Sequence, residues 1–259
     1  MTWSFDPSSG ARAGSHVDGK LLLAFNRSCL VFADVGFCRP RHIGRITMTG
    51  TVATLETLIA AILSKGQAGG RVIAAIAGPP GAGKSTLAET IVDALNVAEP
   101  DSAAILPMDG YHYDDMLLVP RGLRQRKGAP ETFDSAGFAH MLMRLRQNTE
   151  PEIAVPVFDR SIEIARAGAR MIPQSVRYII AEGNYLLLNE GRWRELHAYY
   201  DLTVMIDEPE PVLRARLENR WKDLSPEDRA WKLDGNDLPN GRRVQQQSAV
   251  ADFVIRSVE

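Results

Sequence analysis

Short apolar runs alternate with amphipathic segments along the chain from residue 51 onward. Each apolar run has the length of a strand that is buried on both faces of a parallel sheet. The runs lie at 71–77, 103–108, 178–184, 202–207 and 250–255. Apolar residues recur at helical spacing in 51–66, 85–96, 135–145 and 209–221. This alternation predicts an α/β fold, with three layers (αβα) and a mostly parallel, doubly wound sheet.

Three segments fall outside this alternation. Residues 154–159 and 169–172 resemble two strands around a polar connection, and Pro156 favours an edge position, so we expect a small hairpin flap at about 154–173. Residues 121–134 are rich in charge and turn residues, which predicts a long loop. The charged segment at about 221–243 is expected to form a helical lid.

The first 47 residues differ in charge from the rest of the chain. They contain six Lys and Arg residues against three Asp residues. An apolar run at 21–25 could seed a secretion signal, but Asn26 and Arg27 interrupt it, and the aspartates count against a transit peptide. Met48 is a candidate alternative start. We therefore expect residues 1–47 to form a poorly ordered extension and residues 48–259 to form the folded domain.

Composition narrows the class of protein further. The chain has 259 residues, of which 45% are hydrophobic and 24% charged, as in ordinary globular proteins. Its net charge of −2 gives no reason to expect a nucleic-acid partner. No apolar run reaches the roughly 18 residues that would suggest a membrane span. Two cysteines, Cys29 and Cys38, are too few for a disulfide framework or a zinc site and suit a reducing compartment, so we expect a cytoplasmic protein.

One segment carries a phosphate-binding signature. Residues 78–86 read GPPGAGKST and match the pattern GxxxxGK[ST] between an apolar run and an amphipathic segment. At such a junction, free backbone N–H groups and the helix dipole favour a bound phosphate. Lys84 is expected to reach the outer phosphates and the Ser85 hydroxyl to bind magnesium, whereas an ordinary glycine-rich turn would leave this pair unexplained. The residues expected to bind nucleotide are Gly78, Pro79, Pro80, Gly81, Ala82, Gly83, Lys84, Ser85 and Thr86.

Two acidic residues follow the predicted strands. Asp109 comes directly after 103–108, and Glu182 lies near the end of 178–184. Ligands of open α/β sheets bind outside the carboxyl ends of the strands, and a strand-end acid completes the magnesium site of a phosphate loop. Asp109 is therefore a candidate catalytic carboxylate, although it could instead cap a turn before Gly110. Glu182 is a candidate for the metal side of the site.

With these motifs the chain resembles the P-loop kinase family that includes uridine kinase, pantothenate kinase and phosphoribulokinase. The resemblance covers about residues 70–255. Its blocks are GPPGAGKST (78–86), MDGYHYDD (108–115), RKGAPETFD (126–134) and EGNYLLL (182–188). The third block is similar to pantothenate kinase, and PVFDRSIE (156–163) is similar to the substrate flap of uridine kinases. The chain also resembles a bacterial subgroup labelled nucleoside/nucleotide kinase-like or fructose transport system kinase.

The resemblance implies roles for particular residues. Asp109 matches the catalytic carboxylate of the family, and Lys84 matches the lysine on the outer phosphates. Ser85, Glu182 and Asp109 are the residues expected on the magnesium side. Lid arginines of the family contact the transferred phosphate, and Arg216 and Arg220 are the candidates here. The residues expected to bind the acceptor are Tyr111, His112, Lys127, Phe158, Arg160, Glu163 and Asn184.

One position departs from the uridine kinases. Their flap carries a histidine that reads the pyrimidine, and alignment of the short flap strings places Glu163 there. This difference argues against uridine as the acceptor. Arg160 and Glu163 could instead serve a sugar or a polyol acid.

The sequence thus predicts an ATP- and Mg²⁺-dependent phosphotransferase that acts on an alcohol group of a small metabolite. A nucleoside, a pantothenate-like acid and a sugar all stay open as acceptors. The oligomeric state also stays open between a monomer and a homodimer, although dimers are common among relatives. A GTPase-type switch would need an Asn-Lys-x-Asp signature, which the sequence lacks. A ring-forming ATPase would need a paired acidic dyad where the chain reads Ala-Glu-Gly at 181–183. The intact set of Lys84, Ser85, Asp109 and Glu182 argues against a degenerate binding module.

Overall fold

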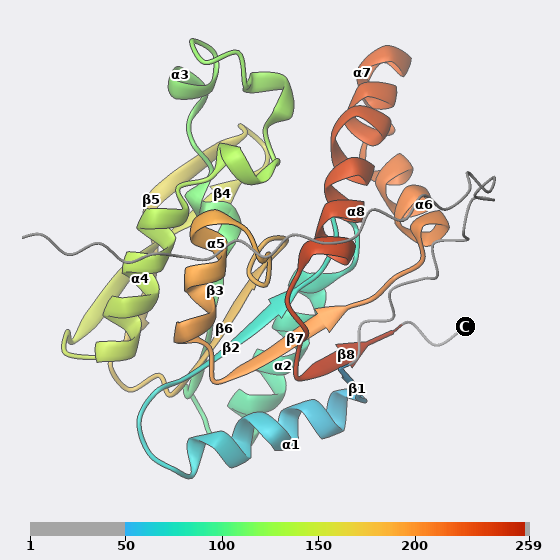
Figure 1. Cartoon of the computed structure of the whole chain (residues 1–259). Coiled ribbons are helices and arrows are strands. Elements are labelled where there is room, and N and C mark those ends of the chain that lie inside the picture. The colour runs from blue at the N-terminus through green and yellow to red at the C-terminus, as the bar shows by residue number, and fades with distance from the viewer. Residues whose placement is uncertain (1–49, 257–259) are drawn as a thin grey trace, which may run out of the picture. The chain divides into compact units, whose positions relative to one another are not determined.

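The computed structural model describes residues 50–256. Within this range six strands form one sheet in the order β1-β8-β7-β2-β6-β3, and every neighbouring pair is parallel (Figure 1). The strands are β1 (Thr51–Val52), β2 (Val72–Ala77), β3 (Ala103–Pro107), β6 (Tyr178–Gly183), β7 (Leu202–Ile206) and β8 (Phe253–Ile255). The predicted parallel sheet is confirmed.

Helices cover both faces of the sheet (Figure 1). The two faces of β2 belong to different hydrophobic clusters. The face that carries Ile73, Ala75 and Ala77 packs with α4 and α5. The opposite face, with Val72, Ala74 and Ile76, packs with α1 and α2. These helices are α1 (Leu55–Gly66), α2 (Lys84–Ala98), α4 (Ser135–Gln147) and α5 (Gly191–Glu195). A strand buried on both faces explains why β2 reads as an unbroken apolar run, and the predicted three-layer αβα fold is confirmed.

The flap is an antiparallel hairpin of β4 (Glu152–Asp159) and β5 (Ile164–Pro173). Both strands are longer than predicted. Backbone pairing continues to Asp159 and Ile164 at the tip, and the added residues 164–168 of β5 are mostly small and exposed, so they give no alternating strand signal. The register shifts between Val155 and Val157, on either side of Pro156, which has no N–H to donate.

Two boundaries differ from the sequence prediction. The helix expected from residue 51 begins only at Leu55, because Thr51–Val52 pairs with β8 and the side chain of Thr54 caps the helix by accepting from the Thr57 N–H. Short helical turns also interrupt the region around the expected loop: α3 (Asp115–Leu118), Arg124–Arg126 and Pro130–Thr132.

The predicted lid is helical, but it does not end at residue 243. It follows α6 (Glu210–Arg220) and consists of α7 (Pro226–Ala230), a π-helical segment (Trp231–Asp237) and α8 (Leu238–Gln247). Val244 of α8 is fully buried, and a Cβ at Gly241 would lie 3.3 Å from Pro79 Cβ. Because α8 packs against the core and the phosphate loop, only the residues before it are candidates for a moving lid.

The extension predicted at residues 1–47 lies outside the described residues. Within 50–256 no helix is both long and apolar enough to cross a membrane. The oligomeric state stays open, and the cytoplasmic location stays a prediction.

Arg71 ties three parts of the fold together at the start of β2. Its side chain is buried, and its guanidinium donates at 2.8–3.3 Å to backbone carbonyls in the last turn of α4, at the end of β5 and in the connection from β5 to β6. The acceptors are Leu145, Pro173, Gln174 and Val176. A cation at a helix C-terminus also opposes the negative end of the helix dipole.

Arg71→Ala is expected to lower the free energy of unfolding by about 3–5 kcal/mol, because several buried carbonyls lose their donor together. Urea unfolding measures this loss. Arg177→Ala is the matched control: its side chain is 47% exposed and forms one ion pair with Glu99 at 3.3 Å, so we expect a cost below about 1 kcal/mol. Equal effects of the two substitutions would contradict a structural role for Arg71.

Candidate active site

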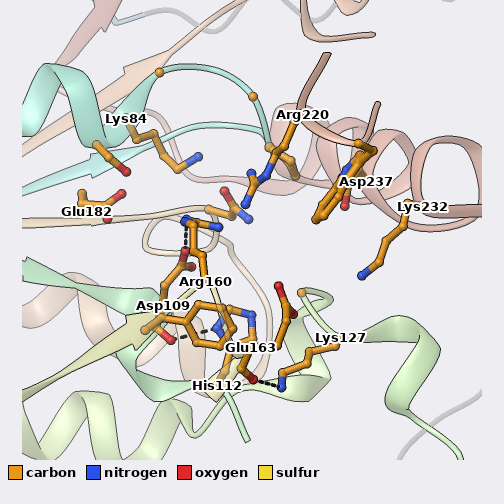
Figure 2. Close-up of a pocket in the computed structure, with 18 of the residues that line it drawn as sticks. Lys84, Asp109, His112, Lys127, Arg160, Glu163, Glu182, Arg220, Lys232 and Asp237 are labelled. Atoms are coloured by element: carbon orange, nitrogen blue, oxygen red, sulfur yellow. Dashed lines mark hydrogen bonds and ion pairs between the residues drawn. The ribbon is translucent and has the colours of Figure 1, made fainter. Parts of the chain in front are cut away.

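A cavity of about 290 Å³ opens at the carboxyl ends of β2, β3 and β6 (Figure 2). Five chain segments line it: the phosphate loop, the connection from β3 to α4, the flap tip, the end of β6, and the end of α6 with the lid that follows. Most of the predicted site residues therefore meet at one edge of the sheet, as expected for ligand sites in parallel α/β folds.

The phosphate loop joins β2 directly to α2, which begins at Lys84. Gly81 and Gly83 have φ angles of +81° and +89°, a left-handed conformation that residues with a Cβ rarely adopt. The Lys84 side chain is buried, and its ammonium donates to the Pro79 carbonyl at 3.0 Å. Burial lowers the pKa of Lys84 to about 8, although Glu182 and Asp109 oppose this change.

Asp109 and Glu182 face the same space as Lys84 (Figure 2). Burial raises the pKa of Glu182 to about 7, and the charge of Asp109 adds to that increase. Burial alone would also raise the pKa of Asp109, but the charges of His112, Arg160 and Lys84 outweigh it, so this pKa lies below its usual value. The arrangement is a pair of carboxylates in different electrostatic surroundings opposite a phosphate-binding loop.

The donor set fits a magnesium ion that arrives with a nucleotide. Among the described residues, no three His, Cys, Asp or Glu side chains form a group that could hold a metal. Mg²⁺ is usually bound through one or two carboxylates plus substrate phosphates, so a complete protein cage is not required. Ser85 and Glu182 both line the cavity, and a hydrogen bond from Ser85 favours the ionised form of Glu182.

The flap and the loop after β3 form the opposite wall. The His112 ring lies between Phe133 and Phe158, with centroid distances of 3.9 and 4.6 Å, and its Nδ1 is 2.8 Å from the Asp109 carbonyl oxygen. Arg160 at the flap tip pairs with the Asp109 carboxylate at 2.7 Å. This wall therefore presents both aromatic surfaces and charged groups to the cavity.

The end of α6 and the lid supply the predicted Arg220 and three side chains that the sequence did not single out: Trp221, Lys232 and Asp237. Trp221 donates through Nε1 to Asp237 at 2.8 Å, while Arg220 and Lys232 lie 5.0 and 5.2 Å from its indole ring. Neither cation has an ion-pair partner within residues 50–256, so both are available to an anionic ligand. Gly128 and Phe133 also line the cavity and were not predicted. Both lie in the block RKGAPETFD at 126–134, and the resemblance of that block to pantothenate kinase is the sequence feature that could have identified them.

Two predicted residues lie elsewhere. Tyr111 is 8% exposed and packs edge-on against Phe138 in the core, with ring centroids 5.0 Å apart, so it does not line the cavity. Arg216 lies beside the loop, where it pairs with Glu208 at 3.4 Å and donates to the Gly81 carbonyl at 3.3 Å. Of the two candidate lid arginines, Arg220 is the one that reaches the cavity.

The remaining predicted residues are distributed as follows. His112, Lys127, Phe158, Arg160, Glu163 and Asn184 all line the cavity, as do Pro80, Gly81, Gly83, Lys84, Ser85 and Thr86 of the loop. Gly78, Pro79 and Ala82 belong to the loop but do not line the cavity. Gly78 approaches β7 closely, since a Cβ there would lie 3.2 Å from Ile206.

Glu163→Ala is expected to raise KM for the predicted phosphate acceptor by about tenfold while leaving KM for ATP nearly unchanged, because Glu163 lies on the flap side of the cavity rather than in the phosphate loop. Steady-state kinetics with both substrates varied measures the two constants. Ile162→Ala is the control, since Ile162 is 49% exposed in the same turn and does not line the cavity. Equal changes in both KM values would remove Glu163 from the acceptor pocket.

The chain is similar over most of its length to several known proteins. No family model matches the chain. It is 35% identical over 193 residues to YggC of Escherichia coli (strain K12), described as uncharacterized, covering 73% of this chain and 79% of that protein. It is 31% identical over 197 residues to the Schizosaccharomyces pombe protein named "Putative uridine kinase C227.14", covering 73% and 84%. Among solved structures, a "putative fructose transport system kinase" from Silicibacter sp. TM1040 shares 40% identity with a TM-score of 0.72, covering 78% of this chain and 98% of that one.

Proposed function

Because the chain belongs to the family of P-loop kinases, we propose that it transfers the γ-phosphate of ATP to a hydroxyl group of a small metabolite. The observation that carries this proposal is the position of Asp109 across the cavity from the phosphate loop. A nucleotide on the loop would direct its outer phosphates toward Lys84 and Arg220. An acceptor against the flap would then lie between those phosphates and Asp109.

The nucleotide side of the site would act mainly by positioning and by charge. Backbone N–H groups of the loop and the N-terminus of α2 would hold the phosphates. Ser85 and Glu182 would hold Mg²⁺, which when bound neutralises charge on the outer phosphates. Lys84 and Arg220 would stabilise the negative charge of the phosphoryl group during transfer.

On the acceptor side, Asp109 would act as the general base. The acceptor oxygen attacks the γ-phosphorus, its proton passes to the Asp109 carboxylate, and the bond from the γ-phosphorus to the bridging oxygen breaks. ADP leaves with that electron pair. Such sites depend on the alignment of the attacking and leaving oxygens, which the flap would set by holding the acceptor.

We call the wall formed by the flap and the loop after β3, where the acceptor would bind, the acceptor wall. It is compatible with an oxygen-rich metabolite. Carboxylates such as Glu163 accept hydrogen bonds from hydroxyl groups, and Lys127 and Lys232 add positive charge. Relatives are named for uridine and for fructose transport. The glutamate in the flap argues against a pyrimidine, so a sugar or a polyol acid is favoured over a nucleoside.

A panel of hydroxyl compounds tests the proposed function directly. Purified protein with Mg-ATP is incubated with nucleosides, pantothenate-like acids, sugars and polyol acids, and ADP release is followed together with the mass of the acceptor. A true acceptor gains one phosphoryl group, and Lys84→Ala slows that gain by about 10²-fold or more. ATP turnover that is independent of every hydroxyl compound, with phosphate as the only product, would contradict the proposed function.

A further inference from the structure

Arg160 lies on the carboxylate that the proposed function assigns as the general base. Its Nη2 is 2.7 Å from Asp109 Oδ2, and Figure 2 shows the guanidinium between Asp109 and the centre of the cavity. The Arg160 side chain is 55% exposed, whereas that of Asp109 is 25% exposed. The contact joins a surface residue of the flap to a catalytic group at the end of β3.

The flap tip is held in place from a second side. Arg160 and Glu163 are the first and last residues of the turn between β4 and β5. The Lys127 ammonium, whose side chain is 2% exposed, donates to the Glu163 carbonyl at 2.6 Å and to Asp115 at 2.8 Å. Glu163 also has a φ of +56°, a left-handed conformation that persists only where the surroundings enforce it. Arg160 is therefore presented to Asp109 from an anchored turn.

We propose that Arg160 is a positioning residue that blocks Asp109 until an acceptor binds, so that water does not consume ATP. The inference rests on the proposed function and adds a device that selects the acceptor over water. In hydrolysis, a water oxygen would attack the γ-phosphorus, the water proton would pass to Asp109, and ADP would leave with the bridging oxygen. The guanidinium occupies one acceptor position of the carboxylate, on Oδ2, and its positive charge opposes the transfer of a proton to Asp109.

The contact between Arg160 and Asp109 also sets a requirement for the acceptor, which must displace Arg160 to reach Asp109. The acceptor displaces Arg160 by offering the guanidinium another hydrogen-bond acceptor, so that the contact with the partly buried Asp109 is exchanged for an equivalent one. Water offers a single small oxygen and does not hold the flap in a second position. An acceptor with several oxygen atoms beside its reacting hydroxyl group can bind Arg160 and expose Asp109 in one step.

The test measures ADP release from Mg-ATP without any acceptor, with the full chain and saturating nucleotide. Arg160→Gln is expected to raise this rate by about tenfold, less than the ~10²–10⁴-fold of full general-base assistance because water stays poorly aligned. Arg160→Lys keeps the charge without the planar guanidinium and is expected to give an intermediate rate. The double variant Asp109→Asn with Arg160→Gln is expected to return to the wild-type rate.

Arg166→Gln is the matched control. Arg166 belongs to the same flap, is 59% exposed and pairs with Asp159 at 2.9 Å, yet it does not line the cavity. It is expected to leave ADP release unchanged. Calorimetric binding of Mg-ATP and the melting temperature are measured on every variant, so that a folding defect is not taken for a change in gating.

The outcomes separate the two proposals. If Arg160→Gln binds Mg-ATP but hydrolyses it no faster than the wild type, the blocking role is overturned and the kinase function stands. If the faster hydrolysis persists in the double variant, Arg160 does not act through Asp109, and the blocking role is again overturned. Failure of the wild type to bind Mg-ATP would overturn the proposed function itself.

Discussion

Asp109→Asn is expected to lower kcat by about two orders of magnitude or more, because general-base assistance is typically worth ~10²–10⁴-fold. The substitution keeps the shape of the side chain and one hydrogen-bond acceptor for Arg160, but it removes the charge and the basicity. The affinity for ATP should change little, since the phosphate loop and α2 supply the nucleotide contacts. Steady-state kinetics with the identified acceptor and calorimetric binding of Mg-ATP measure the two quantities.

An alternative role for Asp109 gives a different result. If Asp109 only caps the turn before Gly110, the asparagine variant melts at a lower temperature while its folded fraction keeps nearly normal kcat. Asp114→Asn is a suitable control, because Asp114 caps α3 by accepting from the Met116 N–H and does not line the cavity. A stable Asp109→Asn protein with wild-type turnover would refute the catalytic assignment.

Lys84→Ala is expected to reduce turnover by about 10²-fold or more, the usual cost of removing one donor that stabilises transition-state charge. Thermal stability should stay nearly unchanged. The structure supplies one hydrogen bond for the ammonium, to the Pro79 carbonyl, but burial of the charge carries a cost that the alanine variant avoids. Initial rates at saturating ATP and a melting curve of the protein without nucleotide test both statements.

Lys65→Ala controls for the loss of a positive charge. Lys65 lies in the last turn of α1, away from the cavity, and its replacement should leave turnover and nucleotide binding intact. Unimpaired catalysis by Lys84→Ala would contradict the assignment of residues 78–86 as the phosphate loop.

The phosphate side of the site could be predicted because its residues are contiguous. The signature at 78–86 fixes both the loop and the helix that follows it, and Asp109 and Glu182 come directly from the ends of buried strands. Sequence alone did not place Tyr111, whose ring turns into the core from a single helical turn. Side-chain direction in such a turn depends on tertiary packing that a motif does not contain.

The lid shows a second limit of prediction. Arg216 and Arg220 are four residues apart on one face of α6, so the sequence spacing does not distinguish which of them reaches the cavity. One helical turn, ~6 Å along the axis, nevertheless separates a residue beside the loop from one in the cavity. Trp221, Lys232 and Asp237 reach the site only because the segment after α6 folds back across it. No periodic pattern in the sequence predicts that this segment folds back across the site.

The two walls of the cavity have unequal consequences for evolution. The phosphate loop is one continuous segment, where most substitutions would disturb the proposed phosphate binding. The proposed acceptor wall is assembled from separate segments after β3, at the flap tip and before α8. Under the proposed function, a substitution at Glu163 or Lys232 would alter the choice of acceptor while the loop stays intact. Under the proposed function, this arrangement would allow the acceptor specificity to change through substitutions in one segment at a time, while ATP binding by the phosphate loop is kept.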